Sequence, residues 1–229
     1  MSLLTDEFVA ALTHKGAELP GFRWYLSAIV CLGALNYPEE IPHVYEQLLS
    51  QHLPETDHSK ASQALREALT KASGIVGACR TGNAIRALAT ATPKHLKDTR
   101  FHRANDTDAI TVERGRALHQ KIYGGNPLFD PSKTVDASPD YTYVVRELFY
   151  GKIFSFPDIL EYRETGQTIV AALIGMDCQV QVRNQMIGML MNGVDRREVE
   201  ANREICLAIA LELGVRFKTA PIDVPSVPS

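Results

Sequence analysis

The sequence lacks any block of clustered Lys and Arg: its 24 basic residues are interspersed with 27 acidic ones, and the formal net charge is −3. Binding to nucleic-acid phosphates depends on clustered cations, so we expect no nucleic-acid partner. Polar residues interrupt every apolar run well before the about 20 residues that span a bilayer, so we expect no membrane partner. The N-terminal segment 1–16 lacks the basic region of a secretory signal and the arginines of a transit peptide. We therefore expect an intracellular protein, cytoplasmic by default, with the organelle left open.

Cysteine is also scarce, and no two cysteines have CxxC spacing. The four cysteines, Cys31, Cys79, Cys178 and Cys206, each lie within an apolar, helix-like stretch. Buried free thiols in a reducing compartment explain this pattern better than a disulfide framework does.

Patterns for metal or phosphate binding are missing too. All seven histidines precede residue 120, and they do not repeat on one helical face as the ligands of a helical metal site would. The stretch GACRTGN (77–83) has neither the Lys nor the preceding strand that a phosphate-binding loop needs. We expect no metal and no cofactor.

Helical patterns fill the sequence, and no convincing β-hairpin occurs, so the predicted fold class is all-α. Residues 22–35 are apolar on nearly every face, which is typical of a buried helix. Thr5 and Asp195 have the positions of N-terminal helix caps. Asp57 or Thr56 is expected to cap a long helix, in which Glu67 and Lys71 are paired four residues apart.

The middle of the chain gives a weaker pattern. Residues 126–139 contain three prolines and are predicted to form a loop. We predict a helix over 140–150, and a helix start at 155–158 with Pro157 in its first turn.

Two related segments organise the chain, one at 66–88 and a denser one at 163–193. Both begin with Arg-Glu, continue through small and branched apolar residues to a Gly, and reach a Cys two or three residues later. Each is predicted to be a helical hairpin, with turns at Gly77 and at 80–82 in the first. We assign residues 1–93 and 112–217 to two repeats, 94–111 to a polar linker, and 218–229 to a flexible tail.

The second segment and its flanks resemble the carboxymuconolactone decarboxylase / AhpD-like superfamily. The residues that carry the resemblance are Arg163-Glu164, the apolar run to Gly175, then Gln181, Arg183, Gln185, Gly188, Asn192-Gly193 and Glu198-Val199. The close match spans about 163–199. With the weaker first copy, the chain is similar over most of its length to duplicated, single-chain members of the kind common in fungi.

The resemblance implies a helical fold with two related repeats, and it implies either lyase or thiol-peroxidase chemistry. The peroxidase branch uses a CxxC pair and a His. Here Cys178 stands alone, because the position three residues later is Gln181, and Gln185 occupies the place of the His. A dithiol cycle needs a resolving thiol near the attacking one. Only Cys79 of the other repeat could supply it.

Glu164 is the main catalytic candidate. A carboxylate in an apolar helix pair could act as a general acid or base near neutral pH. The alternative is a structural role, in which Glu164 pairs with Arg163, Arg183 or a backbone group. Cys178 is the second catalytic candidate, provided that Arg183 or a helix N-terminus lowers its pKa. Its alternative is a small core residue.

The remaining candidates would bind substrate. Arg183 and Arg80 could each hold a carboxylate through two hydrogen bonds, or form ordinary surface salt bridges. Gln185, Gln181 and Asn83 could orient a ligand in a helix-lined pocket, or satisfy helix ends. The pairs Tyr123-Gly124 and Tyr150-Gly151 are interpreted as helix terminators.

These expectations combine into one preferred function and two alternatives. We expect a cofactor-independent enzyme acting on a small organic substrate, by decarboxylation or a related proton-transfer step. One alternative is a thiol-dependent alkylhydroperoxidase-like antioxidant protein. The other is a non-catalytic family member that keeps only the fold and the oligomer interface. The amount of apolar helix surface predicts a homo-oligomer, most simply a dimer or a trimer.

Overall fold

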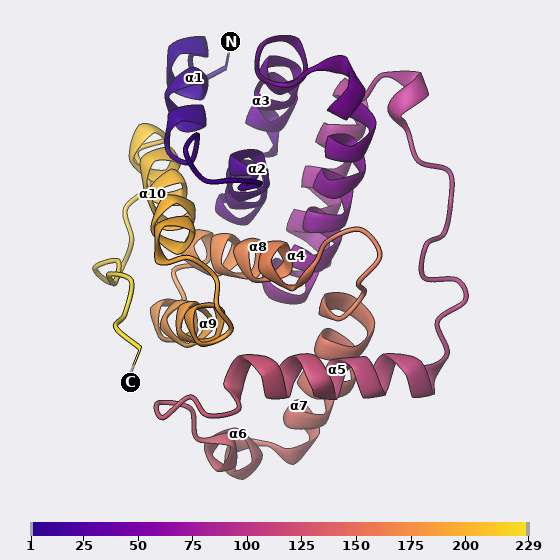
Figure 1. The fold of residues 1–229 in the computed structure, drawn as a ribbon, viewed down its shortest axis with the longest axis vertical. Coiled ribbons are helices and arrows are strands. Elements are labelled where there is room, and N and C mark those ends of the chain that lie inside the picture. Colours follow the sequence, from indigo (N-terminus) through magenta and orange to yellow (C-terminus); the bar gives the residue numbers. More distant parts are fainter. Residues whose placement is uncertain (1, 228–229) are drawn as a thin grey trace.

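The computed structural model describes residues 2–227, which form ten α-helices with 3-10 and π segments between them (Figure 1). No β-strand occurs within this range, so the predicted all-α class is confirmed. None of the described helices is both long enough and apolar enough to cross a membrane. The elements in chain order are α1 (Asp6–His14), α2 (Trp24–Leu35), η1 (Pro38–Glu40), α3 (Ile41–Gln47), η2 (Leu48–His52), α4 (Glu55–Ala91), η3 (Lys94–Leu96), α5 (Asp108–Tyr123), α6 (Pro131–Ala137), α7 (Pro139–Tyr143), η4 (Val144–Phe154), α8 (Tyr162–Gly175), α9 (Gln179–Met191) and α10 (Arg196–Glu212).

Helix α2 lies at the centre of the upper part of the molecule and packs against α4, α8 and α10 (Figure 1). Every residue from Trp24 to Ala34 is buried, as its uniformly apolar sequence predicts. The helix ends at Asn36, which adopts the left-handed conformation that Asn tolerates better than most residues. The predicted caps at Thr5 and Asp195 are confirmed, since both side chains accept backbone N–H groups.

Helix α4 differs from the prediction at its start and in its middle. It begins at Glu55 after Pro54, not after Asp57 or Thr56. The break predicted at Gly77 is confirmed: this residue has φ 81° and ψ 167°, and two helical stretches of α4 meet there at a kink. Residues 80–82, the rest of the predicted turn, are helical. The equivalence of this kinked segment to the hairpin of α8 and α9 is not confirmed, and the two-repeat division stays a prediction.

Lys71 connects α4 to the chain segment between η4 and α8. Its ammonium group is buried and donates to the Phe154 and Phe156 carbonyls and to the Thr165 hydroxyl, the last at 2.9 Å. Glu67 lies 3.9 Å from the same nitrogen, so the pair that the spacing predicted exists, but inside the protein.

The predicted linker is an ordered strap that runs beside α4 and down to α5 (Figure 1). Arg103 anchors it with two hydrogen bonds to buried Glu67, at 2.9 and 2.6 Å. Asp106 accepts two more from Arg114 on α5. Helix α5 begins at Asp108, within the predicted linker, with Thr107 as its cap.

The lower part of the molecule contains α5, α6, α7 and η4 (Figure 1). Helix α6 lies within the predicted loop, because Pro131 takes the first helical position after the cap Asp130. The predicted helix at 140–150 exists as α7 and η4, but it continues to Phe154. The helix start predicted at 155–158 is wrong: α8 begins at Tyr162.

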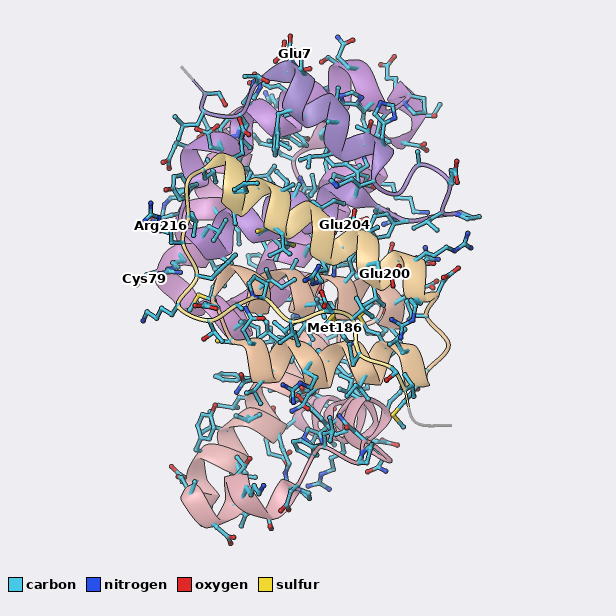
Figure 2. The ribbon with its side chains drawn as sticks, turned by 90° about the vertical axis from the view of Figure 1, so that its left-hand side faces the viewer. Glu7, Cys79, Met186, Glu200, Glu204 and Arg216 are labelled. Carbon is cyan, nitrogen blue, oxygen red and sulfur yellow. The ribbon has the colours of Figure 1, made fainter. Side chains whose placement is uncertain are left out.

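The described part of the tail lies against α9 and α10 (Figure 2). Arg203 donates to the Ile222 carbonyl, and Arg196 donates to the carbonyls of Val224 and Pro225. Gln179 accepts from the Ile222 amide at 3.1 Å. Residues 228–229 of the predicted flexible tail lie outside the described residues.

Candidate functional site

A cavity of about 490 Å³ lies where α5, α6, α7 and η4 meet α4 and α9. Its wall combines polar side chains with apolar and aromatic ones, among them Ile75, Val145, Phe149, Phe154 and Leu173. Two other hollows, one beside the linker and one beside η3, are more open to solvent than this cavity. A mostly apolar cavity with a few convergent polar groups is the usual form of a small-molecule site.

Three hydrogen-bonded side chains form the floor of this cavity, and we call them the Gln–Tyr–Tyr cluster. The Gln185 amide nitrogen donates to the hydroxyl oxygens of Tyr123, at 2.8 Å, and Tyr150, at 3.1 Å. The Tyr150 hydroxyl donates to the Tyr123 oxygen at 2.9 Å. The ring of His119 covers both tyrosines, with centroid distances of 4.7 Å to Tyr123 and 4.9 Å to Tyr150.

Two glycines set the spacing of the tyrosines. Tyr123 is the last residue of α5, and Tyr150 lies in η4, which crosses α5 at very close range. A methyl group added at Gly115 of α5 would lie 2.6 Å from the Gly151 backbone. Because only glycine permits this approach, the Tyr-Gly pair at 150–151 serves the crossing of two helices and does not end a helix. The predicted role of this pair as a terminator is wrong, since η4 continues to Phe154.

The floor carries no charge at neutral pH. Burial, reinforced by the positive charge of Arg146, lowers the pKa of His119 to about 4. Burial raises the pKa of Tyr150 far above its usual range. Burial also raises the pKa of Tyr123, although its hydrogen bonds with Tyr150 and Gln185 act in the opposite direction. Charged side chains that line the cavity, Lys133, Arg146 and Asp130, are exposed.

Of the residues predicted from the sequence, the structure brings two to this cavity. Gln185 is buried in its floor, and Gln181 lies on its exposed side. Sequence reasoning did not find Tyr123, Tyr150 and His119 as site residues. The one available signal was the repeated Tyr-Gly pair, which we assigned to helix ends.

Glu164 lies away from the described cavities. Its carboxylate forms an ion pair with Arg23 at 3.0 Å and accepts the backbone N–H of Glu161 as part of a capping box at the start of α8. Of the partners that the alternative named, the backbone group is confirmed, whereas Arg163 pairs with Glu198. This arrangement gives Glu164 a structural task at a helix terminus.

Cys178 lies in the tight turn between α8 and α9. Its thiol is partly buried and donates to the Met176 carbonyl at 3.5 Å. Burial, with the negative charge of Asp177, raises its pKa, which is the opposite of the activation we considered. Of the four cysteines, Cys31 and Cys206 are buried as predicted, whereas Cys79 is exposed at the molecular edge (Figure 2).

The other predicted substrate-binding residues are dispersed. Arg80 donates to the Ala34 carbonyl and lies 3.0 Å from the Met176 sulfur, so it links α4 to the end of α2 and the α8–α9 turn. Asn83 accepts from Arg86 on the surface. Arg183 is exposed on α9. None of the three lines the cavity above the Gln–Tyr–Tyr cluster.

The chain matches no protein-family profile, and no solved structure matches it. Two curated fungal proteins are similar to it over nearly their whole length. "Peroxisomal protein 2" of Schizosaccharomyces pombe is 32% identical, covering 85% of this chain and 88% of the relative. "Peroxisomal protein 2" of Saccharomyces cerevisiae is 24% identical, covering 88% of this chain and 92% of the relative.

These names correct two of our expectations. Both refer to the peroxisome, an organelle, which contradicts the expected cytoplasmic localisation. Neither points to a decarboxylase or a peroxidase, which contradicts the expected function. The extent of the similarity to the first relative nevertheless settles the relationship: the chain belongs to the Peroxisomal protein 2 family of fungal proteins.

Proposed function

We propose that this chain is a peroxisomal protein that binds a small, largely apolar organic molecule in the cavity above the Gln–Tyr–Tyr cluster. The observation that carries the proposal is the cavity itself, with its apolar walls and a neutral polar floor. Burial of apolar ligand surface against such walls supplies binding energy, and the few polar groups orient the ligand. The peroxisomal part is supported by the names of the two relatives.

The residue types that line the cavity define the kind of ligand. Aromatic rings of Phe129, Phe149 and Phe154 line the apolar part. Lys133 and Arg146 stand at its exposed side, where solvated charges contribute little to affinity. The ligand is therefore held chiefly by apolar burial.

A binding assay tests this function. We expect the neutral dye Nile red to bind the protein with increased fluorescence, and we expect Thr134→Trp to weaken that binding at least about tenfold because the indole occupies the cavity. Thr134 lies on α6, which buries no side chain, so this variant should fold. The matched control is Leu211→Trp, at an 80% exposed position on α10. Equal binding by both variants would refute the cavity as the site.

Localisation is tested separately. A fluorescent protein fused to the N-terminus should coincide with a peroxisomal marker in fungal cells. A diffuse cytosolic signal would contradict the peroxisomal assignment and leave the binding assay unaffected.

Two further parts of the proposal extend to lineage and assembly. We propose that the chain shares the fold of the AhpD-like superfamily. The α8–α9 hairpin, with Gln185 on its second helix, is compatible with this proposal. We also carry forward a homo-oligomer, dimer or trimer. Analytical ultracentrifugation checks it, and a single monomeric species at micromolar concentration would contradict it.

A further inference from the structure

The hydrogen-bond geometry of the Gln–Tyr–Tyr cluster fixes which way the Gln185 amide faces. Its three mutual contacts, at 2.8, 3.1 and 2.9 Å, need three protons. With the amide nitrogen toward the tyrosines, the NH₂ group supplies two and the Tyr150 hydroxyl supplies the third. With the amide reversed, the two hydroxyls supply only two protons, and one contact would be left without a hydrogen bond.

This orientation leaves two hydrogen-bonding functions unused. The Gln185 side chain is 3% exposed, and its carbonyl oxygen has no partner among the described residues. The Tyr123 oxygen already accepts from both neighbours, so its own proton remains available. Buried polar atoms are seldom left without a partner, because each such atom costs about 1–3 kcal/mol. The Gln–Tyr–Tyr cluster thus holds one unused acceptor and one unused donor, on two residues that line the cavity.

The same floor excludes charged groups. Tyr123, Tyr150 and His119 are all neutral near pH 7, and no side chain in the Gln–Tyr–Tyr cluster carries a formal charge that could balance an ion. An ammonium placed there would meet the positive charge of Arg146, and a carboxylate would lose its hydration with only the exposed, solvent-screened Arg146 and Lys133 to balance it. The group that completes the floor must be neutral, and it must both donate and accept.

We propose that the ligand is an apolar molecule bearing a neutral hydroxyl group, whose O–H donates to the Gln185 carbonyl oxygen and whose oxygen accepts from the Tyr123 hydroxyl. This inference rests on the proposed function, because it assigns the ligand class of the same cavity. An aliphatic alcohol has the required chemistry: its chain lies against the phenylalanines, and its hydroxyl meets the floor.

Displacement of Nile red by three eight-carbon probes tests the inference. 1-Octanol donates and accepts, its isomer heptyl methyl ether only accepts, and octanoate is charged. We expect 1-octanol to bind about tenfold more tightly than either of the others, as one satisfied buried hydrogen bond implies. Gln185→Met should reduce the preference for 1-octanol over the ether to less than about threefold, because it removes the acceptor of the ligand O–H. Tyr123→Phe should weaken the binding of both probes by a similar factor, because both oxygens accept from the Tyr123 hydroxyl.

Asn184→Leu is the matched control, because Asn184 lines the cavity but lies outside the Gln–Tyr–Tyr cluster; it should keep the tenfold preference. If Gln185→Met does not fold, Tyr123→Phe and the three probes with the wild-type protein still test the hydroxyl assignment. Equal affinities of wild-type protein for 1-octanol and the ether, or tighter binding of octanoate, would overturn the hydroxyl assignment while leaving the cavity as a binding site. Failure of Nile red itself to bind would overturn the proposed function.

Discussion

The Lys71 ammonium group donates to the Thr165 hydroxyl at 2.9 Å, and this contact joins α4 to α8 inside the protein. The same nitrogen also donates to the carbonyls of Phe154 and Phe156. We expect Lys71→Met to lower the free energy of unfolding by about 2–4 kcal/mol, because both carbonyls would stay buried without a donor. Urea denaturation monitored by circular dichroism measures this loss.

Lys60→Met is the control for that variant, since Lys60 lies on the exposed side of the same helix. Its free energy of unfolding should change by less than about 0.5 kcal/mol. A similar small change for Lys71→Met would show that the buried ammonium group contributes nothing to the connection between α4 and α8.

His119 should make the protein sensitive to acid. Burial, with Arg146, holds the pKa of the folded imidazole at about 4, against 6.5 in the unfolded chain. Between these values the unfolded chain binds a proton at this residue and the folded chain does not, so stability falls as the pH falls from about 6.5 to about 4. Since His119 is partly solvent-accessible, we expect a loss of about 2–3 kcal/mol.

The variant His119→Gln should lose this part of the pH dependence, and His95→Gln, at an exposed position, should retain it. Other groups also titrate on the acid side, including Asp98 and Asp106, whose pKa values are lowered by hydrogen bonds with His102 and Arg114. The difference between the two variants therefore isolates His119. Parallel stability curves between pH 4 and pH 6.5 would disprove the assignment.

The close crossing of α5 and η4 should not tolerate a methyl group. In Gly115→Ala the new Cβ would meet the Gly151 backbone at 2.6 Å, so we expect a loss of about 1–3 kcal/mol and weaker Nile red binding, because the crossing positions both tyrosines. Gly82→Ala is the comparison: its Cβ would meet only the flexible end of Arg86, and alanine favours the helix by about 0.5–1 kcal/mol. Two variants of equal stability would argue against the crossing as a constraint.

Arg103 should determine how firmly the linker is held. Arg103→Met removes both hydrogen bonds to Glu67, whose side chain is 3% exposed, and leaves that carboxylate paired only with Lys71 at 3.9 Å. We expect a loss of about 3 kcal/mol and faster chymotrypsin cleavage after Phe101, which is 89% exposed. Arg100→Met, at a 74% exposed side chain, is the control. Unchanged cleavage in Arg103→Met would contradict the anchoring role.

The sequence predicted those parts of the fold that depend on local pattern. The uniformly apolar stretch around α2, the caps at Thr5 and Asp195, and the all-α class follow from composition and spacing. The errors fall where one residue type has two physical uses. Proline breaks many helices but also begins them, so Pro131 was assigned to a loop although it starts α6.

The sequence predicted less of the candidate site than of the fold. Gln185 was singled out because the resemblance places it where a family histidine stands, and it does lie in the cavity. Tyr123 and Tyr150 come together only because two helices cross, and no local pattern encodes that approach. Glu164 was expected in a catalytic role, but the position of Arg23, far away in sequence, sets its surroundings.

Helices α6 and α7, which supply the outer wall of the cavity, bury no side chain at all. Such a wall can detach locally at a small fraction of the free energy needed to unfold the core around α2. Entry and departure of a bound molecule would then be timed by this peripheral segment alone. Substitutions in this segment could change the residence time of a ligand without changing the melting temperature of the protein. A bound molecule could then exchange quickly while the core around α2 stays folded.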